Sequence, residues 1–411
     1  MNGNNISIII LKQKCLGVEM FNFGLNRREF REQLFERKPW IVRQCFDPSP
    51  FSWSTIDAAL DLQDPTRELL KVLHNGRVDP SHYVEEYVDI GIRTRRIRKE
   101  RLYEMMSKGA TVVLNRIELV SPIVREVCTE IGRFVGAQTT SNAYACLGGE
   151  PATNVHWDTH DVFVLQIGGS KHWRIYEPTH PLPISSQVSN DRKDELPSAP
   201  VIDEILQAGD ALYVPRGWWH KVEPVAGSDT LHLTVAIHTP LILDYFVWAC
   251  GSILPGLLEV RHAVMGDAQD PRHVAEAVSA VSEALMHPAT LEAFYARSRQ
   301  RERVVSPFNI ADLLKQAETP LSTGTRLMLN TRHADGNAER FDVNGAPLQL
   351  TGDHHRVVIL LARHTALDLD GLQQEMPDVE PGSLEAVIRD LAKADIIQIA
   401  VPQATPIPAF A

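Results

Sequence analysis

The sequence has few cysteines, and none of them forms a pair in a short motif. Five are spread over 411 residues without a CxxC motif: Cys15, Cys45, Cys128, Cys146 and Cys250. A sparse, odd-numbered set argues against a disulfide scaffold and against a zinc finger, and it favours a reducing compartment. We therefore expect a cytoplasmic protein.

Long hydrophobic runs are also missing. The longest early apolar run, residues 6–11, is followed by Lys12 and Lys14. It falls far short of the roughly 20 residues that cross a bilayer. Two lysines in place of an extended apolar region and a cleavage site argue against a secretory signal. We expect no association with a membrane.

Positive charge is in deficit. The chain has 41 Lys and Arg against 52 Asp and Glu, a net charge of −11, with 44% hydrophobic and 23% charged residues. A protein that coats nucleic acid is therefore not expected, whereas a basic polypeptide would be attracted. The ordinary composition excludes disordered, collagen-like and coiled-coil chains, and the length suggests two to four domains.

Residues 26–135 show mostly helical patterns with interruptions. Between two of these patterns, residues 93–101 contain six basic side chains and no aromatic one: Arg93, Arg95, Arg96, Arg98, Lys99 and Arg101. Our interpretation of this run is a solvated edge or loop. The alternative is a contact for an acidic partner such as RNA.

From about residue 140 to 240, short strands replace the helices. Residues 162–167 form an apolar run that ends at Gly168-Gly169, and residues 172–176 follow as the expected hairpin partner. Residues 211–214 and 231–237 are two further strands, and residues 178–200 are an exposed excursion. Several short strands with Gly and Pro turns are typical of a β-sandwich or barrel.

After residue 240 the chain returns to helices. Asp270-Pro271 predicts a helix start, with Asp as N-cap, and an apolar stripe follows at Val274, Val278, Val281 and Leu285. Such a stripe is more often core than interface, although it could be buried against a second chain.

The last segment, residues 322–411, predicts three small helices and a closing strand at residues 396–399, an order that resembles a winged helix. It contains seven Lys and Arg against twelve Asp and Glu, a net charge of −5. Because DNA binding requires positive charge, direct DNA binding is not expected. We interpret the segment as a structural or protein-contact module.

Two separated segments suggest a metal site. His156 and Asp158 are two residues apart, so on a strand they project to one face. With 16 histidines in the chain, about one such triplet is expected by chance. The second segment, residues 209–220, runs from a Gly-Asp turn through an apolar strand to His220. In a double-stranded β-helix it can lie beside the first, and two His with one carboxylate leave three coordination positions open, which suits Fe(II).

Four other histidines and one lysine are further candidates for the metal site and its cosubstrate. His160, His172, His232 and His238 are rival ligands, more often core groups or groups that support the ligands. Lys171 opens the strand after the Gly-Gly turn and could anchor the carboxylate of a cosubstrate.

Three segments of the chain carry a resemblance to a known protein family. Three segments, 141–178, 209–222 and 231–237, read SNAYACLGGEPATNVHWDTHDVFVLQIGGSKHWRIYEP, GDALYVPRGWWHKV and LHLTVAI. Together they resemble the JmjC/cupin-type 2-oxoglutarate oxygenases, and among these the ribosomal oxygenase group.

The resemblance implies roles for particular residues. It implies Fe(II) ligation by His156, Asp158 and His220, and a lysine, Lys171, that pairs with the distal carboxylate of 2-oxoglutarate. Three further residues match the cosubstrate pocket: Asn142, Tyr144 and Thr234. Thr234 matches a small hydroxyl residue on the closing strand, whereas Asn142 and Tyr144 could instead be a turn residue and a strand aromatic. Trp218 and Trp219, just before the second histidine, could narrow the substrate entrance.

The resemblance also implies an α+β fold and a domain order. A JmjC/cupin oxygenase domain would span residues 1–242, with N-terminal helices and a double-stranded β-helix (jelly-roll) core at about 138–240. A helical dimerisation segment, 243–321, would follow and make a homodimer. An acidic winged-helix-like domain, 322–411, would end the chain.

The implied activity is that of a 2-oxoglutarate-dependent dioxygenase. With Fe(II), O2 and 2-oxoglutarate, it would hydroxylate an amino-acid side chain, Arg or His, of a ribosomal or other basic protein. The alternatives are a hydroxylase of a peptide natural-product precursor, a demethylase, and a non-catalytic metal-binding cupin.

Overall fold

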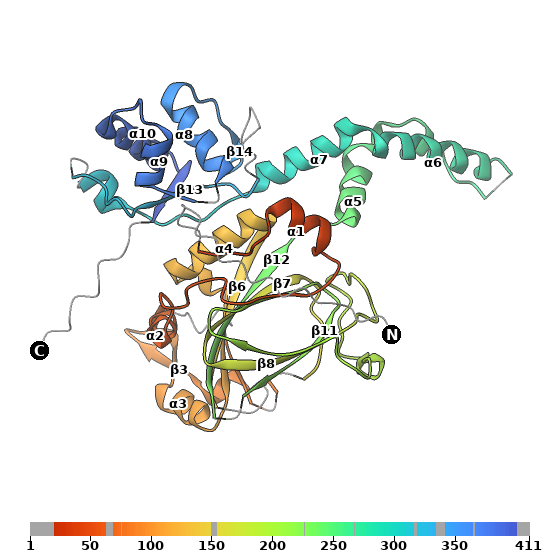
Figure 1. The fold of residues 1–411 in the computed structure, drawn as a ribbon. Coiled ribbons are helices and arrows are strands. Elements are labelled where there is room, and N and C mark those ends of the chain that lie inside the picture. Colours follow the sequence, from red (N-terminus) through yellow and green to blue (C-terminus); the bar gives the residue numbers. More distant parts are fainter. Residues whose placement is uncertain are drawn as a thin grey trace, which may run out of the picture. The chain divides into compact units, whose positions relative to one another are not determined.

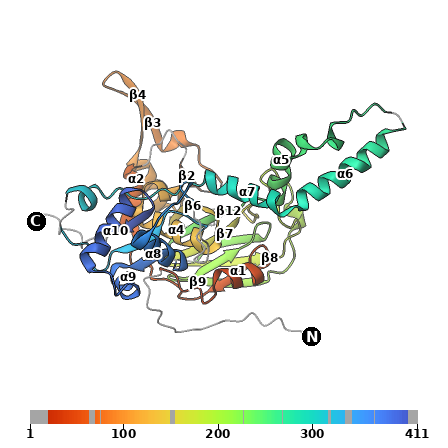
Figure 2. The same cartoon turned by 90° about the horizontal axis from the view of Figure 1, so that it is seen from above.

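The computed structural model describes residues 20–62, 69–74, 76–148, 154–225, 227–266, 268–315, 319–333, 342–364 and 366–400 (Figures 1 and 2). The chain divides into two compact units, Met1–His238 and Thr239–Ala411, each described here by itself. Within the described ranges, no helix has both the length and the apolar character needed to cross a membrane.

The first unit is built on a seven-stranded antiparallel sheet in the order β1-β10-β7-β12-β6-β5-β2. Its strands are β1 (Trp40–Val42), β2 (Leu70–Leu73), β5 (Thr111–Asn115), β6 (Gln138–Leu147), β7 (Asp161–Gly168), β10 (Ala211–Val214) and β12 (Asp229–His238). The apolar runs at 162–167, 211–214 and 231–237 are confirmed as strands, and they occupy neighbouring positions in this sheet.

A second, three-stranded sheet has the order β11-β8-β9. It comprises β8 (Ser170–Tyr176), β9 (Ile202–Gln207) and β11 (Trp219–Pro224). Side chains of both sheets, among them Val164 and Leu212 of the larger sheet and Ile175 and Leu206 of the smaller one, share one buried cluster. The two sheets therefore pack face to face, as expected for a jelly-roll core.

The expected hairpin between residues 162–167 and 172–176 is wrong. Consecutive strands β7 and β8 belong to different sheets, since β7 pairs with β10 and β12 whereas β8 pairs with β9 and β11. Gly168-Gly169 is the corner at which the chain changes sheet. Gly169 has a φ of +61°, and a Cβ there would collide with the backbone carbonyl of Asp229.

The prediction that residues 26–135 are mostly helical is also wrong in part. The helices α1 (Arg27–Gln33), α2 (Trp53–Leu62), α3 (Lys99–Ser107) and α4 (Pro122–Val135) are present. However, β1, β2 and β5 of the same region join the large sheet, and β3 (Val84–Asp89) and β4 (Ile92–Ile97) form a hairpin. These short strands find partners elsewhere in the chain, a relation that local periodicity does not record.

The basic run at 93–101 lies on this hairpin and at the start of α3, where it is exposed. Figure 2 shows the β3–β4 hairpin projecting from the body of the first unit. Arg93 and Arg95 pair with Glu86, and Arg96 pairs with Glu85 on the facing strand. The run is therefore mostly solvent-exposed, and much of its charge is balanced within the hairpin; a contact with an acidic partner stays a prediction.

The second unit begins with α5 (Ile242–Ser252), α6 (Asp270–Met286) and α7 (Pro288–Arg301). Helix α6 starts at Asp270, with Gln269 as its N-cap, one residue before the expected cap. None of its residues is buried, and Val274 and Val278 of the apolar stripe are 50% and 63% exposed. The expectation that this stripe is core is wrong for the single chain.

The rest of the second unit has its own core. Helices α8 (Gly352–Arg363), α9 (Leu369–Glu375) and α10 (Pro381–Lys393) pack with a sheet ordered β16-β13-β17. Its strands are β16 (Leu367–Asp368), β13 (Arg326–Leu329) and β17 (Ile397–Ala400), and a hairpin of β14 (Asp342–Val343) and β15 (Ala346–Pro347) accompanies them. The three helices and the closing strand expected in residues 322–411 are confirmed.

Candidate metal centre and adjoining pocket

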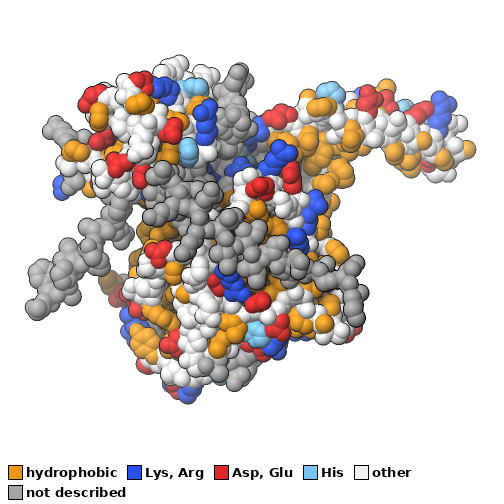
Figure 3. Space-filling model, in the orientation of Figure 1, with side chains coloured by type: hydrophobic (Ala, Val, Ile, Leu, Met, Phe, Trp, Pro, Cys, Tyr) orange, Lys and Arg blue, Asp and Glu red, His pale blue; other side chains and the backbone are white. Residues whose placement is uncertain are grey.

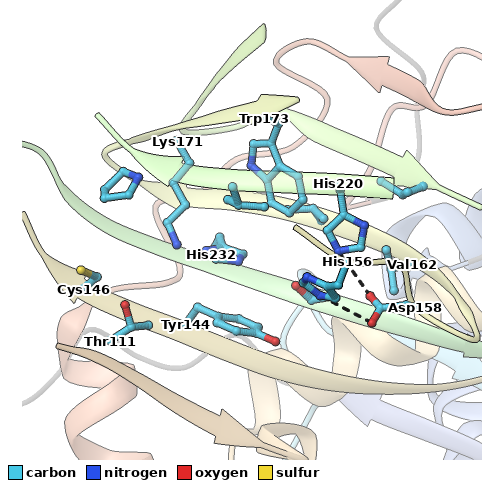
Figure 4. Close-up of a pocket in the computed structure, with 15 residues that line it drawn as sticks. Thr111, Tyr144, Cys146, His156, Asp158, Val162, Lys171, Trp173, His220 and His232 are labelled. Carbon is cyan, nitrogen blue, oxygen red and sulfur yellow. Dashed lines mark ion pairs between the residues drawn. The ribbon is translucent and has the colours of Figure 1, made fainter. Parts of the chain in front are cut away.

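The structure brings His156, Asp158 and His220 together, although they come from two separated segments (Figure 4). One ligand atom from each residue lies within 4.8 Å of the others. Asp158 Oδ1 is 3.9 Å from His156 Nε2, and Asp158 Oδ2 is 3.7 Å from His220 Nε2. Three converging donor atoms of this kind could hold one metal ion.

The backbone fixes this convergence. His220 lies on β11, whereas His156 lies outside the named strands, in an isolated bridge with His220. The amide of His156 donates to the carbonyl of His220 at 3.1 Å, and the amide of His220 donates back at 2.8 Å. The amide of Gly217 donates to the carbonyl of Asp158 at 3.0 Å. The two ligand segments are thus joined directly by main-chain hydrogen bonds.

Each imidazole is oriented by a second hydrogen bond. The Nδ1 of His156 lies 2.8 Å from the carbonyl oxygen of Asn154, and the Nδ1 of His220 lies 3.2 Å from that of Trp218. A carbonyl can only accept, so we assign the ring proton to Nδ1 in both residues. The Nε2 atoms, which face Asp158, are then free of protons and available to a metal.

The charges of the triad suit a cation. Burial and, to a smaller degree, His156 lower the pKa of His220 to about 4, so the imidazole is neutral at pH 7. Burial alone would raise the pKa of Asp158, but His220 and His156 hold it below its ordinary value. A neutral imidazole at His220 and a carboxylate at Asp158 are protonation states that metal binding requires.

Sequence reasoning missed Ser189, whose side chain supports the segment that carries His156 and Asp158. Ser189, buried within the 178–200 excursion, has its hydroxyl 3.2 Å from the amide of Trp157 and 3.4 Å from its carbonyl. Trp157 stands between His156 and Asp158, so this hydroxyl braces the ligand-bearing turn. A serine in a polar, Pro-rich stretch gives no local signal of this role.

The tryptophan pair lies outside the lining of the pocket. Trp219 is fully buried and packs edge-on against Trp157 with ring centroids 4.5 Å apart. Neither Trp218 nor Trp219 lines the cavity beside the triad. Trp218 packs against the buried cluster that includes the pocket residues Val162 and Trp173, so the effect of the pair on the substrate entrance stays a prediction.

A pocket between the two sheets runs from the triad to Lys171. Its lining comprises Thr111, Tyr144, Cys146, His156, Asp158, Val162, Val164, Lys171, Trp173, Val214, His220, Val222, Pro224, His232 and Thr234. Lys171 is only 5% exposed, and its side chain reaches into the pocket from β8 (Figure 4). Burial lowers the pKa of Lys171 to about 8. Within the described part of the chain, no carboxylate lies in ion-pair distance of its amine.

The three other expected pocket residues lie on adjacent strands. Tyr144 and Thr234 line the pocket, from β6 and β12. Asn142 faces Thr234 across the strand pair but is not part of the lining; its side chain bonds Tyr144 and accepts from the amide of Arg116. Burial and, to a smaller degree, the nearby Asp158 raise the pKa of Tyr144 to about 12, so the phenol keeps its proton.

The four rival histidines do not join the triad, which is the ligand cluster found among the described residues. His160 stacks on His238, which contacts Thr140, and His172 pairs with Asp203 away from the pocket. His232 differs, because it lies inside the pocket. Its position two residues before Thr234, on the same strand face, is a signal that could have found it.

Comparison with known proteins places these features in a family context. Residues 118–245 match the model described as JmjC domain. The chain is 26% identical over 215 residues to the Bifunctional lysine-specific demethylase and histidyl-hydroxylase NO66 of Aedes aegypti, covering 51% of this chain and 33% of the mosquito protein. It is 25% identical over 341 residues to Ribosomal oxygenase 1 of Rattus norvegicus, covering 74% and 55%. The chain thus spans about a third to a half of the length of these relatives.

Solved structures show the same fold. The structure of YcfD from Escherichia coli matches with a TM-score of 0.53 at 16% identity, covering 93% of this chain and 100% of YcfD. A structure of YcfD described as a ribosomal oxygenase in complex with cobalt and 2-oxoglutarate matches with a TM-score of 0.52 at 16% identity, covering 92% and 99%. The chain therefore has an α+β, JmjC/cupin-like fold.

Proposed function

Because the chain carries a JmjC domain and is related to the ribosomal oxygenases, we propose that it is an Fe(II)- and 2-oxoglutarate-dependent dioxygenase. The proposed reaction hydroxylates an amino-acid side chain, Arg or His, of a ribosomal or other basic protein. One observation carries the proposal: a single pocket has the His156, Asp158 and His220 donors at one end and the buried amine of Lys171, which pairs with no carboxylate of the described residues, at the other.

The donor set fits iron better than a structural zinc. Two imidazoles and one carboxylate leave open coordination positions, as in non-haem Fe(II) oxygenases, whereas structural zinc is enclosed by four protein ligands. When bound, iron would supply the redox chemistry that couples decarboxylation of 2-oxoglutarate to hydroxylation of a substrate C–H. The cobalt and 2-oxoglutarate of YcfD support this choice of ligands.

The chain's own residues would bind and orient the cosubstrate. Lys171 would pair with its distal carboxylate in a site from which water is largely excluded, where a charged hydrogen bond is strong. The phenol of Tyr144, which lies near Asp158, and the hydroxyl of Thr234 would contact it along the pocket. Asn142 would hold the Tyr144 phenol in place through their hydrogen bond.

Formation of the metal–cosubstrate complex is the first test. Anaerobic addition of 2-oxoglutarate to the Fe(II) protein should produce a weak visible charge-transfer band, and His156→Ala should abolish it because a ligand is lost. His172→Ala, on the outer face of β8, is the matched control and should keep the band. A non-catalytic metal-binding cupin would give no band and no succinate, which would refute the proposal.

The substrate is tested by intact mass. Ribosomal proteins from a deletion strain should include one that is lighter than wild type by the mass of one oxygen atom. If every ribosomal protein is unchanged, hydroxylation of a peptide natural-product precursor becomes the better hypothesis. Demethylation is the second candidate, favoured by the name of the mosquito relative; it would leave the deletion-strain protein heavier by one methylene group.

The proposed organisation has three parts: an oxygenase domain over 1–242, a dimerisation segment over 243–321 and a winged-helix-like acidic domain over 322–411. Exposed apolar side chains on α5 and α6 support a homodimer, among them Ile242, Val247 and Val278. Figure 3 shows hydrophobic side chains along this helical segment. The absence of paired cysteine motifs supports a cytoplasmic location.

A further inference from the structure

One polar side chain in the pocket has no role in the proposed reaction and no hydrogen-bond partner among the described residues. His232 on β12 is 4% exposed, and its Nδ1 is fully buried without a hydrogen bond. Neither ring nitrogen bonds to another described residue. A buried polar atom left unsatisfied costs about 1–3 kcal/mol, so a partner from outside the chain is expected at this position.

Its ring is held in place by two aromatic neighbours. It stacks on Tyr144 with centroids 4.7 Å apart and planes 8° apart, and it meets Trp173 edge-on at 6.0 Å and 88°. Tyr144 also faces His232 directly in the β6–β12 register. These contacts fix the plane of the imidazole, so its nitrogens point in defined directions in the pocket.

The charge state of the ring defines what it can bind. Burial lowers the pKa of His232 well below its ordinary value, and Lys171 lowers it further. The ring is therefore neutral at pH 7 and offers one N–H donor. Figure 4 shows the amine of Lys171 reaching toward His232. A single carboxylate between them would accept from the ammonium and from the imidazole N–H, and would satisfy both groups.

We propose that His232 is a second binding residue for the distal carboxylate of the cosubstrate, acting beside Lys171 to select a dicarboxylate. This inference rests on the proposed function, since it assigns a further contact within the same pocket. The imidazole N–H adds a directional donor that a lysine ammonium, a mobile point charge, does not supply.

The test compares two ligands that differ only at that end. One is 2-oxoglutarate; the other is 2-oxopentanoate, which has a methyl group in place of the distal carboxylate. Affinities are measured by calorimetry on the full-length Co(II)-loaded protein without O2. His232→Phe keeps an aromatic ring against Tyr144 but has no donor. We expect it to weaken 2-oxoglutarate binding roughly 10- to 100-fold, with 2-oxopentanoate and Co(II) binding unchanged.

A second variant separates the donor from the ring. His232→Asn loses the stacking but keeps an amide N–H donor, so it should retain more discrimination between the two ligands than His232→Phe. His172→Phe, on the outer face of β8, is the control and should match wild type. In turnover assays, His232→Phe should raise the KM for 2-oxoglutarate with little change in kcat.

The outcomes distinguish the two proposals. If His232→Phe lowers the affinity for both ligands equally, or for neither, His232 has no specific role in binding the distal carboxylate. The inference is then wrong even if the enzyme is active. If the wild-type Co(II) protein binds no 2-oxoglutarate, the proposed function fails. If His232→Phe does not fold, His232→Leu takes its place: a discrimination ratio equal to that of wild type would contradict the inference, and a loss of discrimination that His232→Asn partly restores would support the donor.

Discussion

At the scale of single residues, the pocket depends on how burial changes the charge of a few side chains. Lys171 is nearly enclosed, and among the described residues it has no acidic partner; burial lowers its pKa to about 8. Its amine is still mostly charged at pH 7, but it is poised to lose that charge in mildly alkaline solution. A carboxylate bound beside it would restore the charged form.

This gives a prediction for pH dependence. As the pH rises above about 8, free Lys171 loses its proton, so binding of 2-oxoglutarate must take up a proton and its affinity should fall by up to about tenfold per pH unit. Below pH 7, where Lys171 is almost fully protonated, its titration should no longer change the affinity for 2-oxoglutarate. Calorimetry on the Co(II)-loaded protein between pH 6.5 and 9.5 would measure the profile.

Two controls accompany the profile. Lys171→Met should bind 2-oxoglutarate weakly at every pH, with no decline above 8, because the titrating amine is gone. Binding of 2-oxopentanoate to wild type should also be level there. A Lys171→Met profile that still declines like the wild type would assign the titration to another group.

The sequence predicted this site unevenly, for reasons that the residues make plain. His156, Asp158 and His220 were identifiable because histidine and aspartate are metal ligands and because their spacing on strands predicts that the side chains converge. His232 was not separated from the other histidines, because its importance comes from Tyr144 and Trp173 on neighbouring strands. Ser189 could not be found at all, since only the folded excursion places its hydroxyl against Trp157.

At the scale of elements, the strands with strong apolar runs were predictable and their partners were not. Gly168-Gly169 has the composition of a hairpin turn, yet the chain changes sheet there. Which sheet a strand joins depends on distant segments: β1 pairs with β10, and β11 with β8. The short strands of residues 26–135 were missed for the same reason.

The corner between β7 and β8 gives a matched pair of substitutions. Gly169→Ala should destabilise the first unit by about 2 kcal/mol or more, because a left-handed residue acquires a Cβ directed at the Asp229 carbonyl. Gly168→Ala meets only Leu231 at an ordinary 3.7 Å and should cost less than about 1 kcal/mol. Urea unfolding midpoints would measure both.

A similar midpoint for the two variants would show that the corner is not the constraint described here. Gly169→Ala has a second expected effect, on binding. Lys171 lies two residues beyond the corner, so a displaced backbone should also weaken 2-oxoglutarate binding, whereas Gly168→Ala should leave it unchanged.

At the scale of the whole molecule, the second unit exposes more apolar surface on its first helices than a monomer needs. No residue of α6 is buried, and Met286 at its end is 81% exposed. Exposed apolar patches of this kind mark surfaces that contact another protein. The proposed homodimer would cover this surface with a second copy of the same segment.

We therefore predict that the full-length protein sediments as a dimer and that Val278→Asp shifts it toward monomer. A charge on the apolar stripe would have to be desolvated in the interface, which is costly. Ser279→Asp, on the adjacent exposed position, is the control and should remain dimeric. Analytical ultracentrifugation measures the change, and a monomeric wild-type protein would contradict the prediction.

The main-chain hydrogen bonds between His156 and His220 have a consequence for a cell that runs short of iron. Because main-chain hydrogen bonds join the two donor segments directly, withdrawal of the proposed iron should abolish activity without unfolding the protein. The folded, metal-free protein would regain activity as soon as the metal binds again, without synthesis of new protein.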